Sequence, residues 1–312
     1  MRVLTALLLT IYLSGPTLAQ NAAADSTGLP GDHFSLEGAL ELFKNAKTLE
    51  AFEQALNAED QRVNNLDLDG NGEVDYVRVV DHAEGDAHAI ALQVPVTKSE
   101  TQDVAVIELE KNGTESALLQ IRGAEELYGS EVIIEPFEEK DEVPTMKGPA
   151  PPEELPRVRI WVNVWAWPCV TWIYAPNYVV WNSPYYWGYY PPRWRPWRPW
   201  GWSAWHGWHR PYHGWYQPVH TCRVLHAHGV YQHRAMHSPT VRARTAAIRT
   251  TRATTRPTQV KDQPKPARIE PAPAPKPNSS MQGSNGGKRS AAKPTKRPAK
   301  KKGSAPNRTK GQ

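Results

Sequence analysis

One stretch in the acidic half of the chain, residues 67–75, carries oxygen-bearing side chains at alternate positions, with a glycine at its sixth position. Calcium is a hard cation that takes about six to eight oxygen ligands, and such a loop turns several oxygens toward one point. The stretch therefore predicts a structural calcium site, whose candidate ligands are Asp67, Asp69, Asn71, Glu73 through its carbonyl group, and Asp75.

The loop departs from an EF-hand at its twelfth position, where Arg78 cannot supply a bidentate carboxylate, and the residues after it favour a strand. A weak site is expected, with a dissociation constant of about 10⁻⁴ to 10⁻³ M. A tight turn without an ion is the alternative, because Asp, Asn and Gly favour such turns by themselves.

The elements that position this loop follow from hydrophobic periodicity. Apolar residues at helical spacing after Ser35 and after Thr48 predict two short capped helices. Asn112-Gly113 is a hairpin signal between two strands. Period-two or β-rich runs predict strands at residues 74–81, 90–96, 104–110, 117–121 and 132–135. Residues 157–181 also alternate, which predicts a pair of strands broken at Pro168 and Pro176 that could extend this sheet. The expected fold is α+β: two N-terminal helices packed on a small antiparallel meander, then an irregular Trp/Tyr/Pro-rich segment and a disordered basic tail.

Charge divides the chain into two halves. Residues 20–156 carry a net charge of −21, and residues 157–312 carry +25. All 13 Trp lie between Trp161 and Trp215, on the basic side of this boundary. Opposite charges joined through an aromatic zone favour a protein that holds other molecules over one that transforms them.

Composition also divides the chain into segments. A positive start, a short apolar run and small residues before Gln20 predict a signal peptide at 1–19. The apolar run is shorter than the roughly 20 residues that a membrane span needs, so no integral span is expected. The protein is then periplasmic or secreted. The expected segments are a linker at 20–32, an acidic domain at 33–140, a Pro/Glu linker at 141–156, an aromatic region at 157–237 and a tail at 238–312.

Two cysteines and a cluster of histidines lie in the basic half. In an oxidising compartment Cys169 and Cys222 could form a disulfide, and free structural thiols are the alternative. Eight of the 11 His lie between His206 and His237, which favours adventitious binding of transition metals. The Gly and Pro residues around them argue against a site of fixed geometry.

The aromatic zone prefers Trp and Tyr to Phe, so its rings keep a polar edge. Three interpretations compete. The rings pack on one another, they bind a glycan or a lipid headgroup, or they stack on single-stranded nucleic acid beside arginines.

The basic tail is predicted to be a solvated polycation whose binding weakens with salt. Its partners would be an anionic envelope polymer or glycan, such as lipopolysaccharide or an acidic polysaccharide, or extracellular nucleic acid. Folding back onto the acidic domain and a spacer without a partner are the alternatives. The candidate polyanion-binding residues are Lys296, Arg297, Lys300, Lys301 and Lys302.

Five short motifs carry a family resemblance: NNLDLDGNGEVDYVR at 64–78, TQDVAVIELE at 101–110, LYG at 127–129, WAWP at 165–168 and WGYY at 187–190. Through them, residues 34–200 resemble a family of uncharacterised exported proteins of Bacteroidota. The resemblance implies export from a Gram-negative cell and no particular activity.

The sequence therefore favours a non-enzymatic envelope or secreted protein that presents aromatic and polycationic segments to an anionic surface polymer. No residue is singled out as catalytic. The alternative is a glycan or cell-wall hydrolase that uses carboxylates of the acidic domain, with the rings as a sugar platform. The sequence sets neither the ligand nor the oligomeric state.

Overall fold

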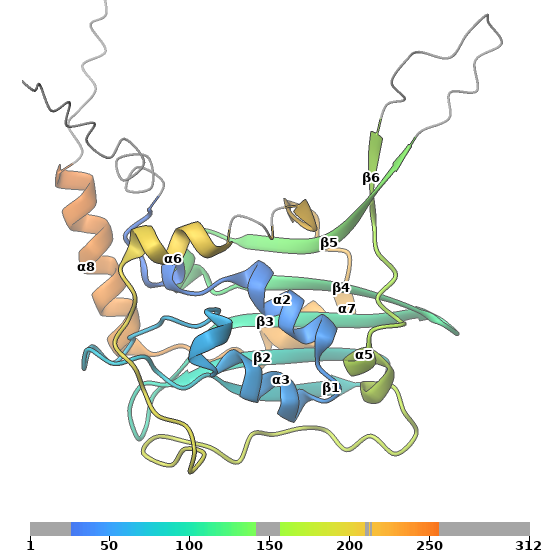
Figure 1. Ribbon diagram of the computed structural model, residues 1–312, viewed down its shortest axis with the longest axis horizontal. Helices are drawn as coiled ribbons and strands as arrows, with labels where there is room; N and C mark the ends of the chain where they lie inside the picture. Colours follow the sequence, from blue (N-terminus) through green and yellow to red (C-terminus); the bar gives the residue numbers. More distant parts are fainter. Residues whose placement is uncertain (1–25, 142–156, 210–211, 213, 256–312) are drawn as a thin grey trace, which may run out of the picture. The chain divides into compact units, whose positions relative to one another are not determined.

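The computed structural model describes residues 26–141, 157–209, 212 and 214–255, all of which fall within one compact unit of the chain. The structure is α+β, with helices packed against a seven-stranded antiparallel sheet (Figure 1). The strands are β1 (Arg78–Glu84), β2 (Ala87–Pro95), β3 (Thr101–Gly113), β4 (Ser116–Gly123), β5 (Val132–Asp141), β6 (Arg157–Trp161) and β7 (Tyr216–Val219). The helices are η1 (Pro30–His33), α2 (Leu36–Asn45), α3 (Leu49–Leu56), η2 (Glu59–Gln61), α4 (Glu125–Tyr128), α5 (Pro168–Ile173), α6 (Trp202–His209), α7 (Leu225–Gln232) and α8 (Pro239–Thr255).

The sheet is larger than the predicted small meander. Strands β1 to β5 follow one another as expected, and β6 and β7 from the aromatic region both pair with β5. The reason is the length of β5, because only its first residues, 132–134, pair with β4. The remaining backbone groups of β5 need partners, and the aromatic region supplies them. The predicted class is confirmed, but the acidic and aromatic parts share one sheet.

Helices α2 and α3 cover one face of the sheet. Each begins at the predicted cap: Ser35 Oγ accepts from Gly38 N–H at 3.0 Å and Thr48 Oγ from Ala51 N–H at 3.1 Å. Their apolar stripes bury Phe43 and Phe52 completely. These rings belong to the main core, together with the large side chains of β2 and β3. Complete burial of such side chains is the principal stabilising contribution to a fold of this kind.

Helix α7 covers the opposite face of the sheet (Figure 1), where β2 carries small side chains. Ala87 and Ala89 of β2 pack against Ala227 and Val230 of α7 in a second, separate core. Strand β2 is buried along its whole length because both of its faces are covered. Large and small residues alternate along β2, so its large side chains fill the core beneath α2 and α3 and its alanines let α7 pack closely on the other face.

Two local expectations are corrected by the structure. The hairpin signalled by Asn112-Gly113 exists, but β3 continues through Gly113 and the turn lies at Thr114-Glu115. Pro168 does not end a strand. It occupies the first turn of α5, where its missing N–H costs nothing.

The predicted disordered tail begins with a helix, α8, which extends to Thr255. Ser238 caps it, since its Oγ accepts from Val241 N–H at 3.2 Å, and Pro239 is its first residue. The arginines of α8 reach acceptors of the acidic part: Arg242 pairs with Glu126 at 3.1 Å. For residues 238–255, folding back onto the acidic domain therefore describes the structure. The rest of the tail, the predicted signal peptide and residues 142–156 of the predicted Pro/Glu linker lie outside the described residues.

Both cysteines are free thiols and belong to different cores. Cys169 is buried in the core beneath α2 and α3, whereas Cys222 packs at the margin of the α7 core on the other face of the sheet. Within the described ranges, no helix is long and apolar enough to span a bilayer.

Candidate functional site

The predicted calcium loop brings together three of its five candidate ligands. One carboxylate oxygen from each of Asp67, Asp69 and Asp75 lies within 4.8 Å of the other two. The loop is shaped by its own backbone, because Asp67 accepts from the N–H groups of Gly70 and Gly72. Both glycines have positive φ, +77° and +84°, which explains why the tight turn requires them.

Negative charge in this cluster is only partly compensated. Asp75 is buried, and burial together with the carboxylates of Asp69 and Asp67 raises its pKa to about 7. The pKa of Asp69 is also raised, first by burial and then by Asp67. Carboxylates that repel one another in this way are stabilised by a cation. The residues present therefore fit a hard divalent ion such as Ca²⁺.

The other two candidate ligands, the Asn71 side chain and the Glu73 carbonyl group, stay predictions. The Asn71 amide donates to Asp69 and its carbonyl oxygen accepts from Glu73 N–H at 2.7 Å, while the Glu73 side chain is exposed. Sequence reasoning missed Arg244 of α8, whose guanidinium donates to the carbonyl groups of Leu68 and Asp69. Arg244 thus binds the loop from a helix that is distant in the sequence, and no local sequence pattern predicts this contact.

The aromatic segment 174–201 runs along the open edge of β1. Asp81 N–H donates to Trp181 O at 2.8 Å, Ser183 N–H donates to Val79 O at 3.0 Å, and an isolated bridge joins Val80 to Asn182. The segment thus covers an edge that would otherwise leave backbone groups unpaired.

A buried carboxylate, Glu53 of α3, holds this segment against the domain. It accepts from Ser183 Oγ at 2.7 Å, from Tyr76 OH at 2.8 Å and from Val79 N–H at 2.9 Å. Burial raises the pKa of Glu53 despite these bonds. Since these partners are all donors of the fold itself, this carboxylate serves the structure.

The predicted calcium loop and the aromatic segment are joined directly. Val74 N–H, at the end of the loop, donates to Trp197 O at 2.7 Å. Two residues further on, the buried Tyr76 ring contacts the Trp194 ring edge to face, with centroids 5.1 Å apart. The position of residues 194–197 therefore depends on how the loop ends.

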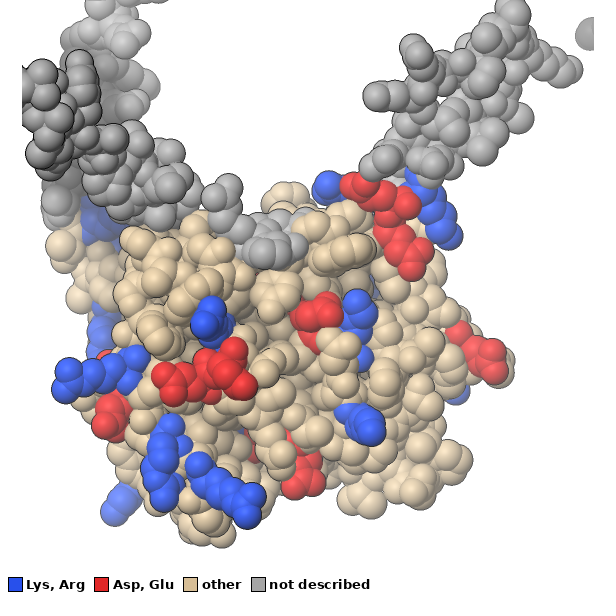
Figure 2. Space-filling model, in the orientation of Figure 1, with Lys and Arg blue, Asp and Glu red and all other residues tan. Residues whose placement is uncertain are grey.

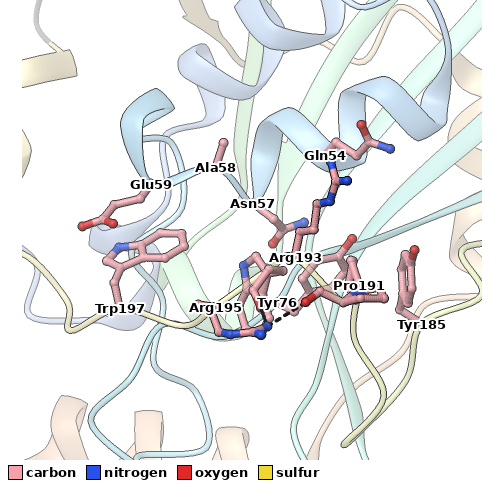
Figure 3. Close-up of a pocket in the computed structure, with 12 residues that line it drawn as sticks. Gln54, Asn57, Ala58, Glu59, Tyr76, Tyr185, Pro191, Arg193, Arg195 and Trp197 are labelled. Atoms are coloured by element: carbon pink, nitrogen blue, oxygen red, sulfur yellow. Dashed lines mark hydrogen bonds between the residues drawn. The ribbon is translucent and has the colours of Figure 1, made fainter.

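These contacts enclose a pocket of about 670 Å³ between the end of α3 and the aromatic segment (Figure 3). Tyrosine, tryptophan and proline rings form most of its wall, and arginines stand at the exposed side. Among the described residues that line it, the one carboxylate is Glu59. The full lining is Gln54, Asn57, Ala58, Glu59, Tyr76, Tyr185, Pro191, Pro192, Arg193, Trp194, Arg195 and Trp197.

Two donors in the pocket lining are unused. The indole N–H groups of Trp194 and Trp197 are buried and have no hydrogen-bond partner among the described residues. A buried donor without an acceptor costs about 1–3 kcal/mol. A ligand whose hydroxyl or carboxylate oxygens reached these N–H groups would remove this cost, and the nearby guanidinium groups of Arg193 and Arg195 favour the anionic form.

The face of the molecule shown in Figure 2 is not a single basic patch. On the face shown in Figure 2, acidic and basic side chains are interspersed, and most of the area carries neither. Of the 27 Lys and Arg in the basic half, 15 lie beyond residue 255. The candidate polyanion-binding residues, Lys296 to Lys302, are among these and lie outside the described residues.

No protein-family model, no curated protein and no solved structure matches this chain. The resemblance to exported proteins of Bacteroidota stays a prediction, and function must be argued from the site.

Proposed function

We propose that this chain is an exported, non-enzymatic binding protein that holds an anionic surface glycan. The unused indole donors of Trp194 and Trp197 carry this proposal. A sugar ring lies against the aromatic wall, its hydroxyl or carboxylate oxygens accept from these N–H groups, and the arginines at the mouth pair with its negative charge. The polycationic tail adds attraction to the same polymer that depends on salt.

Binding is favoured over hydrolysis by the acid–base content of the pocket. A glycosidase needs two carboxyl groups about 5 to 9.5 Å apart on either side of the bond that it cleaves. Glu59 stands in the lining without a second carboxylate among the described lining residues, and Glu53 lies behind Tyr76 with its oxygens occupied.

Calcium has a supporting role in this proposal. Bound by Asp67, Asp69 and Asp75, it fixes the end of the loop and, through Val74, the backbone of Trp197. The ion organises one wall of the pocket and takes no part in a reaction.

Titration calorimetry of the mature protein, which starts at Gln20, tests the pocket. The probes are polygalacturonate, neutral dextran and single-stranded DNA. We expect polygalacturonate to bind, and the double variant Trp194→Phe/Trp197→Phe, which keeps a smaller aromatic ring at each position but removes both N–H groups, to bind about tenfold more weakly. Trp215→Phe is the matched control, because Trp215 is 65% exposed and does not line the pocket.

Replacement of Lys296, Arg297, Lys300, Lys301 and Lys302 by Gln isolates the contribution of the tail. The variant should bind more weakly at low salt and show a smaller salt slope. If the double Trp variant binds normally and all loss follows the tail, the pocket is not the site. Equal affinity for single-stranded DNA would assign the rings to nucleic acid, and release of reducing ends would establish the hydrolase.

A further inference from the structure

A second group of ligand-type side chains lies on the other face of the sheet. Glu108 of β3, Cys222 in the loop before α7 and His228 of α7 each place one ligand atom within 4.8 Å of the other two. Glu108 is fully buried, and its Oε1 lies 2.7 Å from His228 Nδ1. The donors come from three separate elements that the fold brings to one point.

Close packing of α7 fixes this geometry. The helix lies directly on the alanines of β2 and on Val106 of β3, so its residues approach the β3 side chains. The loop that carries Cys222 is held by its neighbour, because Arg223 N–H donates to Gln120 Oε1 at 2.8 Å. Both sides of the cluster are therefore positioned before any ligand binds.

The donor set is one that a borderline transition metal selects. A thiolate, an imidazole and a carboxylate are all ligands of Zn²⁺, and calcium does not take sulfur. Three protein ligands leave a fourth tetrahedral position for water. The exposed fraction of the His228 side chain is 22%, which gives an ion a route from solvent.

The surrounding groups suit a divalent ion at this point. Arg122 donates to both oxygens of Glu108 and also pairs with Glu131. When a metal takes Oε1, the guanidinium keeps Oε2, and the charges of the metal, Arg122, the Cys222 thiolate and the two glutamates then sum to zero. His228 Nε2 faces the Gln232 amide at 2.9 Å, so a flipped amide can accept the imidazole N–H.

We propose that Glu108, Cys222 and His228 form a Zn²⁺ site that fastens α7 to β3. Binding forms bonds from zinc to Cys222 Sγ, His228 Nδ1 and Glu108 Oε1. The thiol releases one proton to solvent, and the imidazole proton moves from Nδ1 to Nε2. No oxidant or reductant is involved. The site is independent of the glycan pocket on the other side of the sheet.

Cobalt substitution tests the proposal, because a thiolate bound to Co²⁺ gives a sulfur-to-metal charge-transfer band and a tetrahedral ligand field. We expect the mature protein to bind one Co²⁺ with this spectrum and to exchange it for Zn²⁺ with the release of about one proton. Cys222→Ser should lose the band, and His228→Gln should bind Zn²⁺ on the order of 100-fold more weakly. Circular dichroism of each variant verifies its fold.

His226→Gln is the matched control. His226 lies on the same helix but its side chain is 84% exposed and pairs with Glu110. This variant should bind Co²⁺ as the parent protein does. The proposal is overturned if the parent spectrum lacks a charge-transfer band, if Cys222→Ser retains it, or if metal binding follows His226 instead of His228.

Discussion

The two clusters of ligand-type side chains differ in how the chain assembles them. Asp67, Asp69 and Asp75 lie within one loop, so their alternation is visible in the sequence. Glu108 and His228 are 120 positions apart and meet only because α7 packs on β3. A local cluster can be predicted from spacing, whereas a cluster built by tertiary packing requires the fold.

They also differ in electrostatic balance. In the loop, burial and then the carboxylates of Asp69 and Asp67 raise the pKa of Asp75, so a bound cation would stabilise the cluster. Glu108 already has Arg122 on both oxygens and does not need a metal to be stable. In the absence of metal, removing a carboxylate should therefore destabilise the protein at Glu108 and should not destabilise it in the loop.

The largest effect is expected for Glu108→Gln in metal-free buffer. Arg122, 8% exposed in its side chain, would lose its buried partner, and breaking a buried ion pair costs about 3–5 kcal/mol. Urea unfolding measures the change. Glu110→Gln, on the same strand but paired with the exposed His226, should cost less than about 1 kcal/mol. A Glu108 variant as stable as the Glu110 variant would mean that the pair contributes nothing.

A pH test addresses Asp103, which holds the chain just beyond α7. The Asp103 carboxylate accepts from Met236 N–H and from the Gln93 amide, yet burial raises its pKa to about 6. At a pH between the pKa of Asp103 in the unfolded state and its pKa in the folded state, the folded protein therefore keeps a proton on Asp103 that the unfolded chain has released. Stability should fall as pH rises from about 4 to about 6, by about 3 kcal/mol for this group.

Urea unfolding of the parent and of Asp103→Asn across this pH range is the measurement. The Asn variant should lack that part of the slope, whatever its absolute stability, because an amide does not titrate there. Identical slopes in the two proteins would show that other carboxylates, such as Glu53, account for the pH dependence.

Much of the fold was predictable because it is local. The caps Ser35 and Thr48, the period-two strands and the meander up to β5 follow from neighbours along the chain. An extension of the sheet by residues 157–181 was predicted and is confirmed for residues 157–161, whereas the pairing of β6 and β7 with β5 was not predictable, since it depends on β5 extending beyond β4. Helix α8 was missed because composition was given more weight than the Ser238-Pro239 start signal before an alanine- and arginine-rich run.

The candidate site divides in the same way. The turn of the loop and its three converging carboxylates follow from sequence, and the pocket does not, because its wall joins α3 to residues 191–197 more than a hundred positions later. One signal was present for the α7 face: alanine alternates with larger residues in β2, which predicts a close-packed second layer.

A smaller change in stability is expected from calcium, which should stabilise the loop and not the α7 cluster. With about 10 mM Ca²⁺ and a dissociation constant of about 10⁻⁴ to 10⁻³ M, bound calcium should stabilise the parent by about 1–3 kcal/mol. Asp75→Asn should lose this gain, and without calcium it should be at least as stable as the parent, since the substitution relieves repulsion from Asp69. Thermal unfolding with calcium or with EGTA measures both. A calcium response retained in the variant would place the ion elsewhere.

The smallest expected effect concerns coupling between the loop and the pocket. Asp75 is separated from Trp197 only by Val74, whose N–H donates to the Trp197 carbonyl group. In the presence of calcium, Asp75→Asn should therefore weaken polygalacturonate binding by roughly twofold to fivefold. This loss is smaller than the roughly 1.4 kcal/mol that corresponds to a tenfold change in affinity. Cys222→Ser should leave that affinity unchanged, because it alters the far face of the sheet. Equal losses in both variants would indicate general loosening of the fold, and calorimetry at matched calcium concentration distinguishes this from a pocket wall set by the loop.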